Sequence, residues 1–303
     1  MLLEKKIPFS YILNKIRTDI VYIIVIAVFF YLLKYFFLEY LPAIPLAMVS
    51  IVGTAISLIL AFRINQSYDR WWEARKVWGA IVNDSRTLVL QLASFIREAD
   101  LQREEIKQVY IRIAHRQIAW CYCLGQSLRK SDPLANMGHL IGPEELTSIA
   151  QHSNKPNALL RQHTSDLKIL VAENIIDSIQ QVQLDNTILR LCESMGKCER
   201  INNTVFPRTY SLIVHFFIYM FTVMLSLSLV ESVGLYELPI LTVIASAFLL
   251  IERTGIEMQD PFRGRPTDTA VTSIARTIEI NIRQMLGEQE IPAPYEPDGF
   301  YQL

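Results

Sequence analysis

A row of side chains recurs every three or four residues along one stretch of the sequence, and its chemistry changes along the row. Its members are Thr54, Leu58, Phe62, Gln66, Asp69 and Glu73. Residues at these spacings share one face of an α-helix. The row begins weakly polar, becomes hydrophobic and ends in two carboxylates. Neither a lipid-facing stripe nor a soluble core should end this way, so we interpret it as a helix face that lines a water path.

A less specific interpretation remains open. Leu58 and Phe62 can pack between helices, and Asp69 and Glu73 can lie on a solvated surface. Composition alone favours this second interpretation, because most apolar pairs on membrane helices are packing residues.

The elements that position this row are predicted membrane spans. The chain has 303 residues, of which 51% are hydrophobic and only 19% charged. Crossing about 30 Å of hydrocarbon takes roughly 20 apolar residues. Residues 41–62 and 209–230 meet this length without a charge. Two shorter runs approach it as 20–38 and 232–251, if Lys34 snorkels to the interface and Glu237 lies near an end. We therefore expect four spans.

The distribution of basic residues predicts the orientation of these spans. Lys and Arg precede the first span, follow the second, precede the third and follow the fourth, whereas Lys34 is the single basic residue between the first two. Both termini and the long middle region are therefore expected in the cytoplasm of a cell whose plasma (inner) membrane holds the spans. The first residues lack a signal-peptide pattern, so the first span should persist in the mature chain.

The predicted organisation has four parts. Residues 1–62 hold the N-terminus and two spans, 63–208 a helical cytoplasmic domain, 209–251 two further spans, and 252–303 a cytoplasmic C-terminal segment. Within the middle part, helical periodicity covers 100–128 and 157–202, and 131–156 reads as a loop with at most a short helix. Residues 54–78 lack glycine and proline, which predicts one long helix that continues from the second span.

Several function classes are disfavoured. The formal net charge of −1 gives no cationic field for nucleic acid. Five scattered histidines and the absence of a phosphate-binding loop argue against an enzyme or a bound cofactor. The four cysteines lack zinc-site spacing and are expected to be reduced and buried: Cys121, Cys123, Cys192 and Cys198. A transporter lacks support apart from His215, which is expected to be a packing residue.

Two short motifs carry a family resemblance. The run 67–75, Ser-Tyr-Asp-Arg-Trp-Trp-Glu-Ala-Arg, follows an apolar span directly, and Asp260-Pro261-Phe262 follows the last one. Together and in this order, they resemble the bestrophin family, specifically its bacterial branch, over residues 8 to 300. The resemblance implies an all-α homopentamer around one axial pore, with four membrane helices per subunit and a large helical cytoplasmic region.

The resemblance also implies residue roles. Thr54, Leu58 and Phe62 align with a hydrophobic neck, which agrees with the row found above, and Ile179, after Asp177, aligns with a second constriction at the cytoplasmic exit. Animal members bind activating calcium through acidic residues after the Pro-Phe element. This sequence instead has Arg263 and Arg265 there, so calcium gating is not expected.

The expected function is an ion channel for monovalent ions in a lipid bilayer. The family's animal members indicate chloride, whereas Asp69 and Glu73 in a vestibule below the neck indicate cations. Neighbouring arginines can neutralise these acids, so the sequence favours monovalent cations only slightly. The alternative from a different class is a membrane-anchored helical scaffold or signalling oligomer without conductance.

Overall fold

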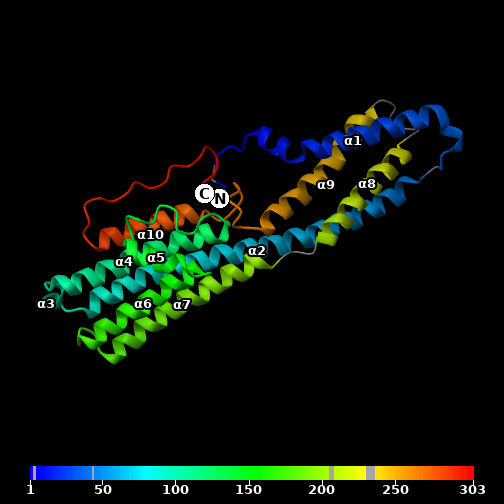
Figure 1. The fold of residues 1–303 in the computed structure, drawn as a ribbon. Helices are drawn as coiled ribbons and strands as arrows, with labels where there is room; N and C mark the ends of the chain where they lie inside the picture. Colours follow the sequence, from blue (N-terminus) through cyan, green and yellow to red (C-terminus); the bar gives the residue numbers. More distant parts are fainter. Residues whose placement is uncertain (3–4, 43, 205–207, 230–235) are drawn as a thin grey trace. The chain divides into compact units, whose positions relative to one another are not determined.

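The structure is a computed structural model that describes residues 1–2, 5–42, 44–204, 208–229 and 236–303. Within these residues the regular secondary structure is helical, and β-type pairing is limited to isolated bridges near the two termini (Figure 1). The chain forms two compact units. We call Glu4–Arg70 with Val205–Gln259 the membrane unit, and Met1–Leu3 with Trp71–Thr204 and Asp260–Leu303 the globular unit.

Among the described residues, four helices are long and apolar enough to span a membrane, as the sequence predicts. They are α1 (Phe9–Phe37), α2 (Leu46–Phe95), α8 (Arg208–Ser228) and α9 (Glu237–Gln259). The α1 helix begins well before residue 20, and α9 continues beyond residue 251. The predicted ends at Val230 and Ser232 lie outside the described residues. A 3-10 turn, η1 (Leu38–Tyr40), follows α1.

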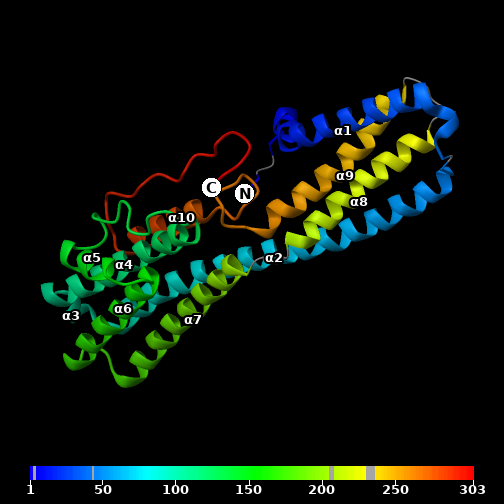
Figure 2. The same ribbon diagram turned by 45° about the vertical axis from the view of Figure 1, so that its right-hand side comes forward.

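The membrane unit is held together by apolar packing among its helices. The α1 helix lies against α8 and α9, which also lie side by side (Figure 2). Ile23, Leu60, Ile218 and Leu249 are almost fully buried in the shared core. A Cβ atom at Gly53 would lie 2.9 Å from the Phe221 ring, so glycine permits the close approach of α2 to α8.

Lys34 does not snorkel as predicted. Its side chain is buried and bonds to Glu237, and it also donates to the Ser226 carbonyl oxygen at 2.8 Å. Ser226 Oγ donates to Glu237 Oε1 at 2.5 Å. The lysine can stay inside because the carboxylate and the serine satisfy it there. The sequence pattern missed this pairing, because its members are about 200 residues apart.

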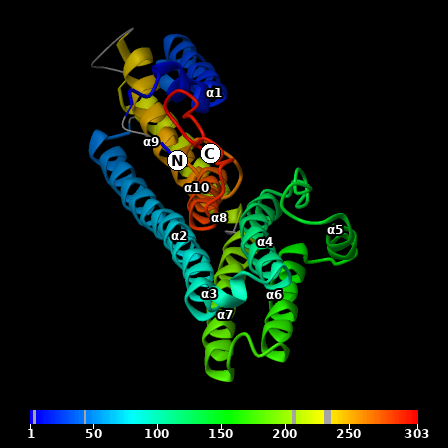
Figure 3. The same cartoon turned by 90° about the vertical axis from the view of Figure 1, so that its left-hand side faces the viewer.

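The globular unit has a core built on the second part of α2. Trp78 and Trp120 are fully buried there, among apolar residues from α4 (Glu104–Leu128), α6 (Lys155–Ala172), α7 (Ser178–Asn203) and α10 (Val271–Met285). Figure 3 shows α4 beside α6, and α4 also contacts α10. The α3 helix (Glu98–Leu101) precedes α4, and α5 (Pro143–Ala150) is the short helix allowed within the predicted loop.

The predicted helical run 157–202 is two helices. Asn174 adopts a left-handed conformation with φ 56°, and it lies between the end of α6 and the start of α7. Ile175 and Ile176 are buried after it. Asp177 then caps α7, accepting a hydrogen bond from the Gln180 amide at 2.8 Å. Periodicity missed the break because the apolar residues continue through it.

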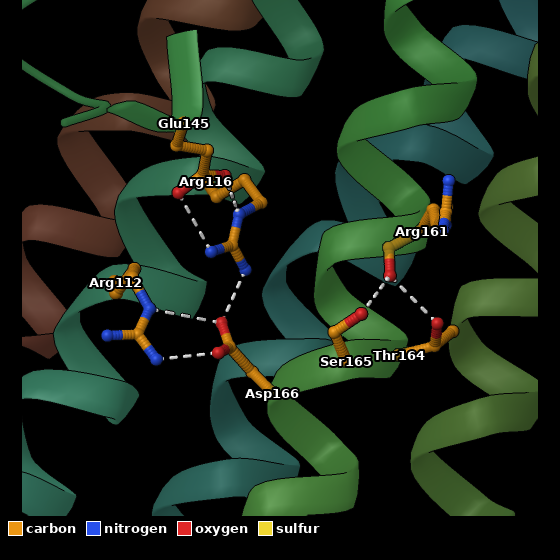
Figure 4. A network of polar contacts seen from close by, with 7 residues as sticks. All are labelled: Arg112, Arg116, Glu145, Arg161, Thr164, Ser165 and Asp166. Atoms are coloured by element: carbon orange, nitrogen blue, oxygen red, sulfur yellow. Dashed lines mark hydrogen bonds and ion pairs between the residues drawn. The ribbon is translucent and has the colours of Figure 1, made fainter. Parts of the chain in front are cut away.

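An ion-pair network joins α4, α5 and α6 within the globular unit (Figure 4). Asp166 accepts hydrogen bonds from Arg112 Nη2 and Arg116 Nη1, each at 2.6 Å. Arg116 is 3% exposed and also binds Glu145. A buried guanidinium is tolerated here because two carboxylates surround it. Nearby, the Thr164 and Ser165 hydroxyls donate to the Arg161 carbonyl oxygen within α6.

The four cysteines are free, and three of them are buried as expected. Cys121, Cys123 and Cys198 are buried, whereas Cys192 is half-buried. Burial raises the pKa of Cys121 and Cys123 to about 12, and it also raises the pKa of Cys198. These thiols are therefore protonated and unreactive at neutral pH.

Candidate functional site

The candidate neck residues lie one turn apart along α2 in the membrane unit. Thr54, Leu58 and Phe62 are all exposed in the single chain, Leu58 by 57% and Phe62 by 60%. The Thr54 hydroxyl donates to the Ser50 carbonyl oxygen at 2.8 Å, so its polar group is satisfied within the helix. The structure thus presents one weakly polar and two large apolar side chains on a face that the described part of the chain leaves exposed.

The other side of α2 is buried and carries a charge. Ile56 and Leu60 pack in the core of the membrane unit. Arg63, which directly follows Phe62, is 1% exposed. Its Nη1 donates to Glu252 Oε1 on α9 at 2.7 Å, and its Nη2 donates to Ser211 Oγ on α8 at 2.5 Å. These bonds fix the rotation of α2 where the apolar row ends.

The two acidic candidates differ in their surroundings. Asp69 is exposed and has no ion pair or hydrogen bond from its side chain within the described part of the chain. Glu73, in the globular unit, accepts a hydrogen bond from Arg200 Nη2 on α7 at 2.5 Å. The arginine that pairs with Glu73 is therefore distant in sequence, and it is none of the neighbouring arginines on α2.

Ile179 lies in the first turn of α7, in the globular unit. Its side chain is 70% exposed, and Val182 on the next turn is 58% exposed. The reciprocal hydrogen bonds between Asp177 and Gln180 fix this helix start. Two apolar side chains are therefore held outward at a rigid helix end.

Within the globular unit, Trp71 of the first family motif bonds to the loop that follows the second motif. The Trp71 ring stacks on Trp72 with centroids 6.2 Å apart, and Trp71 Nε1 donates to the Thr267 carbonyl oxygen at 2.9 Å. Phe262 is buried in the core of the same unit. The loop after α9 therefore packs on the start of the globular part of α2.

The loop after the Pro-Phe motif shows no arrangement of carboxylates around a cation. Asp260 pairs with Arg263 at 3.4 Å. Asp268 is buried, and its Oδ2 accepts a hydrogen bond from the Arg265 amide at 3.0 Å. Burial raises the pKa of Asp268 above its ordinary value. No group of three or more possible metal ligands occurs among the described residues.

Sequence reasoning missed the partners of the buried charges. Glu252 and Ser211 hold the buried Arg63, and Arg253 holds the buried Asp19 at 3.0 Å. The charges of Glu252 and Asp19 within otherwise apolar helices were the available signal, because a charge in a membrane span is costly unless it is paired.

A long helix with an outward apolar row, within a unit of four candidate spans, defines a multi-pass helical membrane protein. The family model described as bacterial/fungal bestrophin protein matches residues 6–284. The chain therefore belongs to the bacterial bestrophin family, which is a family of channels rather than enzymes.

Named relatives agree with this family. The voltage-dependent anion channel-forming protein YneE of Escherichia coli (strain K12) is 32% identical over 259 residues, which cover 85% of this chain and 82% of that protein. A protein of Ralstonia nicotianae, also named voltage-dependent anion channel-forming, is 30% identical over 245 residues, which cover 80% of this chain and 78% of that protein.

A solved structure agrees as well. The crystal structure of a bacterial bestrophin homologue from Klebsiella pneumoniae matches with a TM-score of 0.83 at 27% identity, over 91% of this chain and 100% of that one.

Proposed function

We propose that the protein is a homopentameric channel for monovalent ions, with α2 lining its axial pore and Thr54, Leu58 and Phe62 forming the neck. The outward row on α2 carries this proposal. Its apolar members are more than half exposed in a single chain, while the opposite face is buried and anchored through Arg63. Copies of this row around one axis form a hydrophobic ring that resists ions by dewetting.

The proposed channel has a second constriction and a defined orientation in the membrane. Ile179, exposed at a capped helix end, forms the second constriction at the cytoplasmic exit. Both termini and the globular unit lie on the cytoplasmic side of the inner membrane, in line with the basic residues that flank the spans.

The channel prefers monovalent cations, and Asp69 is the main cause. Its carboxylate is exposed without a partner among the described residues, so a ring of copies concentrates cations at the vestibule. Glu73 contributes less, because Arg200 neutralises its charge. The sequence predicts two rings of carboxylates at the vestibule, whereas we propose that the Asp69 ring alone carries the uncompensated charge.

An anion preference is the second candidate. The printed names of the Escherichia coli and Ralstonia relatives, which describe anion channel-forming proteins, favour it. Arg263 and Arg265 add positive charge in the globular unit but do not belong to the proposed pore row.

Ion flux from liposomes tests the channel against the scaffold alternative. Purified protein in vesicles loaded with potassium chloride should release ions when a salt gradient is imposed, and empty vesicles should not. Oligomers that are intact by size-exclusion chromatography but show no flux and no single-channel current would contradict the channel and favour the scaffold.

A further inference from the structure

His215 lies beside the charged cluster behind the proposed neck. It belongs to α8, one turn after Ser211, and its Nδ1 lies 3.0 Å from the Ser211 carbonyl oxygen. A carbonyl oxygen can only accept, so Nδ1 carries the hydrogen. In a neutral imidazole, the other nitrogen, Nε2, then has a lone pair and no hydrogen.

That second nitrogen faces a buried carboxylate. Nε2 of His215 lies 3.1 Å from Oε2 of Glu252, and Glu252 is fully buried. Neither of these two atoms has a hydrogen-bond partner among the described residues, so their contact is an ion-pair distance only. A lone pair and a carboxylate oxygen repel each other at this distance unless a hydrogen lies between them.

One proton must therefore be shared by the pair. Either an imidazolium donates to the carboxylate, or a neutral carboxylic acid donates to Nε2, and the proton belongs to the two groups jointly. With the proton in place, Glu252 is held by His215 through Oε2 and by Arg63 through Oε1. Without it, the carboxylate is repelled on one side, and the anchor of Arg63 is loosened.

The other charged and titratable groups around His215 have partners of their own. On α9, Arg253 pairs with Asp19 of α1 at 3.0 Å. On α8, the Tyr219 ring stacks on the imidazole with centroids 6.5 Å apart, and it lines a cavity with Tyr22 of α1. On α2, Arg63 binds the far oxygen of Glu252. The His215 side chain is 21% exposed in the single chain, so it is not sealed inside the core of the membrane unit.

We propose that His215 and Glu252 hold a titratable proton that sets how firmly Arg63 fixes α2, which makes them positioning residues for Phe62 and makes conduction depend on pH. This inference rests on the proposed neck. Arg63 is the next residue after Phe62, so loosening its anchor changes the rotation of α2 at the neck itself. Because the protonated pair clamps the helix, current rises as the proton is lost.

The test is the pH dependence of single-channel current and open probability in planar bilayers. Wild-type current should rise several-fold between about pH 5 and about pH 8, the range in which histidine titrates. In His215→Gln, the amide can donate to Glu252 at every pH. Its current should therefore stay at the low-pH level throughout. The control His152→Gln, in the globular unit, should keep the wild-type profile.

A second arm tests the link to the neck. In a Leu58→Ala, Phe62→Ala background the rise with pH should disappear, because the ring that Arg63 positions is already open. A wild-type current that is flat or falls with pH, a rise that His215→Gln retains, or a full rise in the widened neck would each overturn the inference. Such results in a conducting channel leave the proposed function intact, whereas absence of all current contradicts that function instead.

Discussion

Leu58 and Phe62 are the residues on which the proposed barrier depends. Replacing both by alanine removes the bulk that keeps water out of the neck, so single-channel conductance or open probability should rise several-fold. Thr54→Ala should have a smaller effect, because Thr54 contributes less apolar bulk. Planar-bilayer recording measures both variants.

The matched control for the neck variants is Val243→Ala. Val243 is 68% exposed on α9, so it is an apolar residue of a membrane helix outside the row on α2. Its substitution should leave conductance unchanged. If the Leu58 and Phe62 double variant behaves like this control, the two side chains do not form the barrier.

Asp69 and Glu73 have different surroundings, and this difference predicts different effects on selectivity. Asp69→Asn should shift the reversal potential towards the chloride equilibrium value, because it removes an unpaired charge. Glu73→Gln should shift it less, because Arg200 already compensates that charge. Bi-ionic recordings compare the two variants, and equal shifts would show that the Arg200 pair does not screen Glu73.

At the scale of elements, the sequence was sufficient for the spans and for the continuous helix through residues 54–78, because hydrophobic length and the absence of glycine and proline are local properties. It was not sufficient for the break between α6 and α7, where Asn174 turns the chain inside an apolar run. Nor could it pair Lys34 with Glu237 or Arg63 with Glu252, because those contacts depend on how distant helices pack.

The helices of the globular unit are predicted to depend on Asp166. Asp166→Asn removes the carboxylate that binds both Arg112 and Arg116, and it leaves a buried guanidinium with Glu145 alone. Loss of one partner of a buried ion pair costs about 3 kcal/mol. The midpoint of thermal unfolding should therefore fall by several degrees in circular dichroism.

The control for this variant is Glu173→Gln. Glu173 pairs with Arg103 at 3.4 Å, but both side chains are about half exposed. Such a pair contributes less than about 1 kcal/mol, so the midpoint should change little. Equal effects of the two substitutions would contradict the role assigned to the buried network.

We predict that calcium does not gate the channel, because the described loop after α9 offers no cluster of free carboxylates. Asp260 pairs with Arg263, and Asp268 accepts a backbone amide, so neither presents an array of oxygens to a hard cation. Chelating cytoplasmic calcium should change open probability by less than about twofold. Steep activation at micromolar calcium would require a site other than this loop.

At the scale of the whole molecule, the family assignment and the single-chain geometry combine into one account. The family supplies the class of channel, and the chain supplies an apolar row, an unpaired carboxylate and a buried anchor behind the row. The sequence could predict the row itself, because its members recur at helical spacing. It could not predict that, among the described residues, Glu73 is paired and Asp69 is not, because the partner of Glu73, Arg200, lies on a separate helix.

The measurement that tests this account most directly is the reversal potential of the wild-type channel across a potassium chloride gradient. The proposed place of Asp69 at the vestibule predicts a value near the potassium equilibrium potential, which moves towards the chloride value in Asp69→Asn. A wild-type reversal potential near the chloride equilibrium value, unchanged in an Asp69→Asn, Glu73→Gln double variant, would contradict the cation preference and the cause assigned to it.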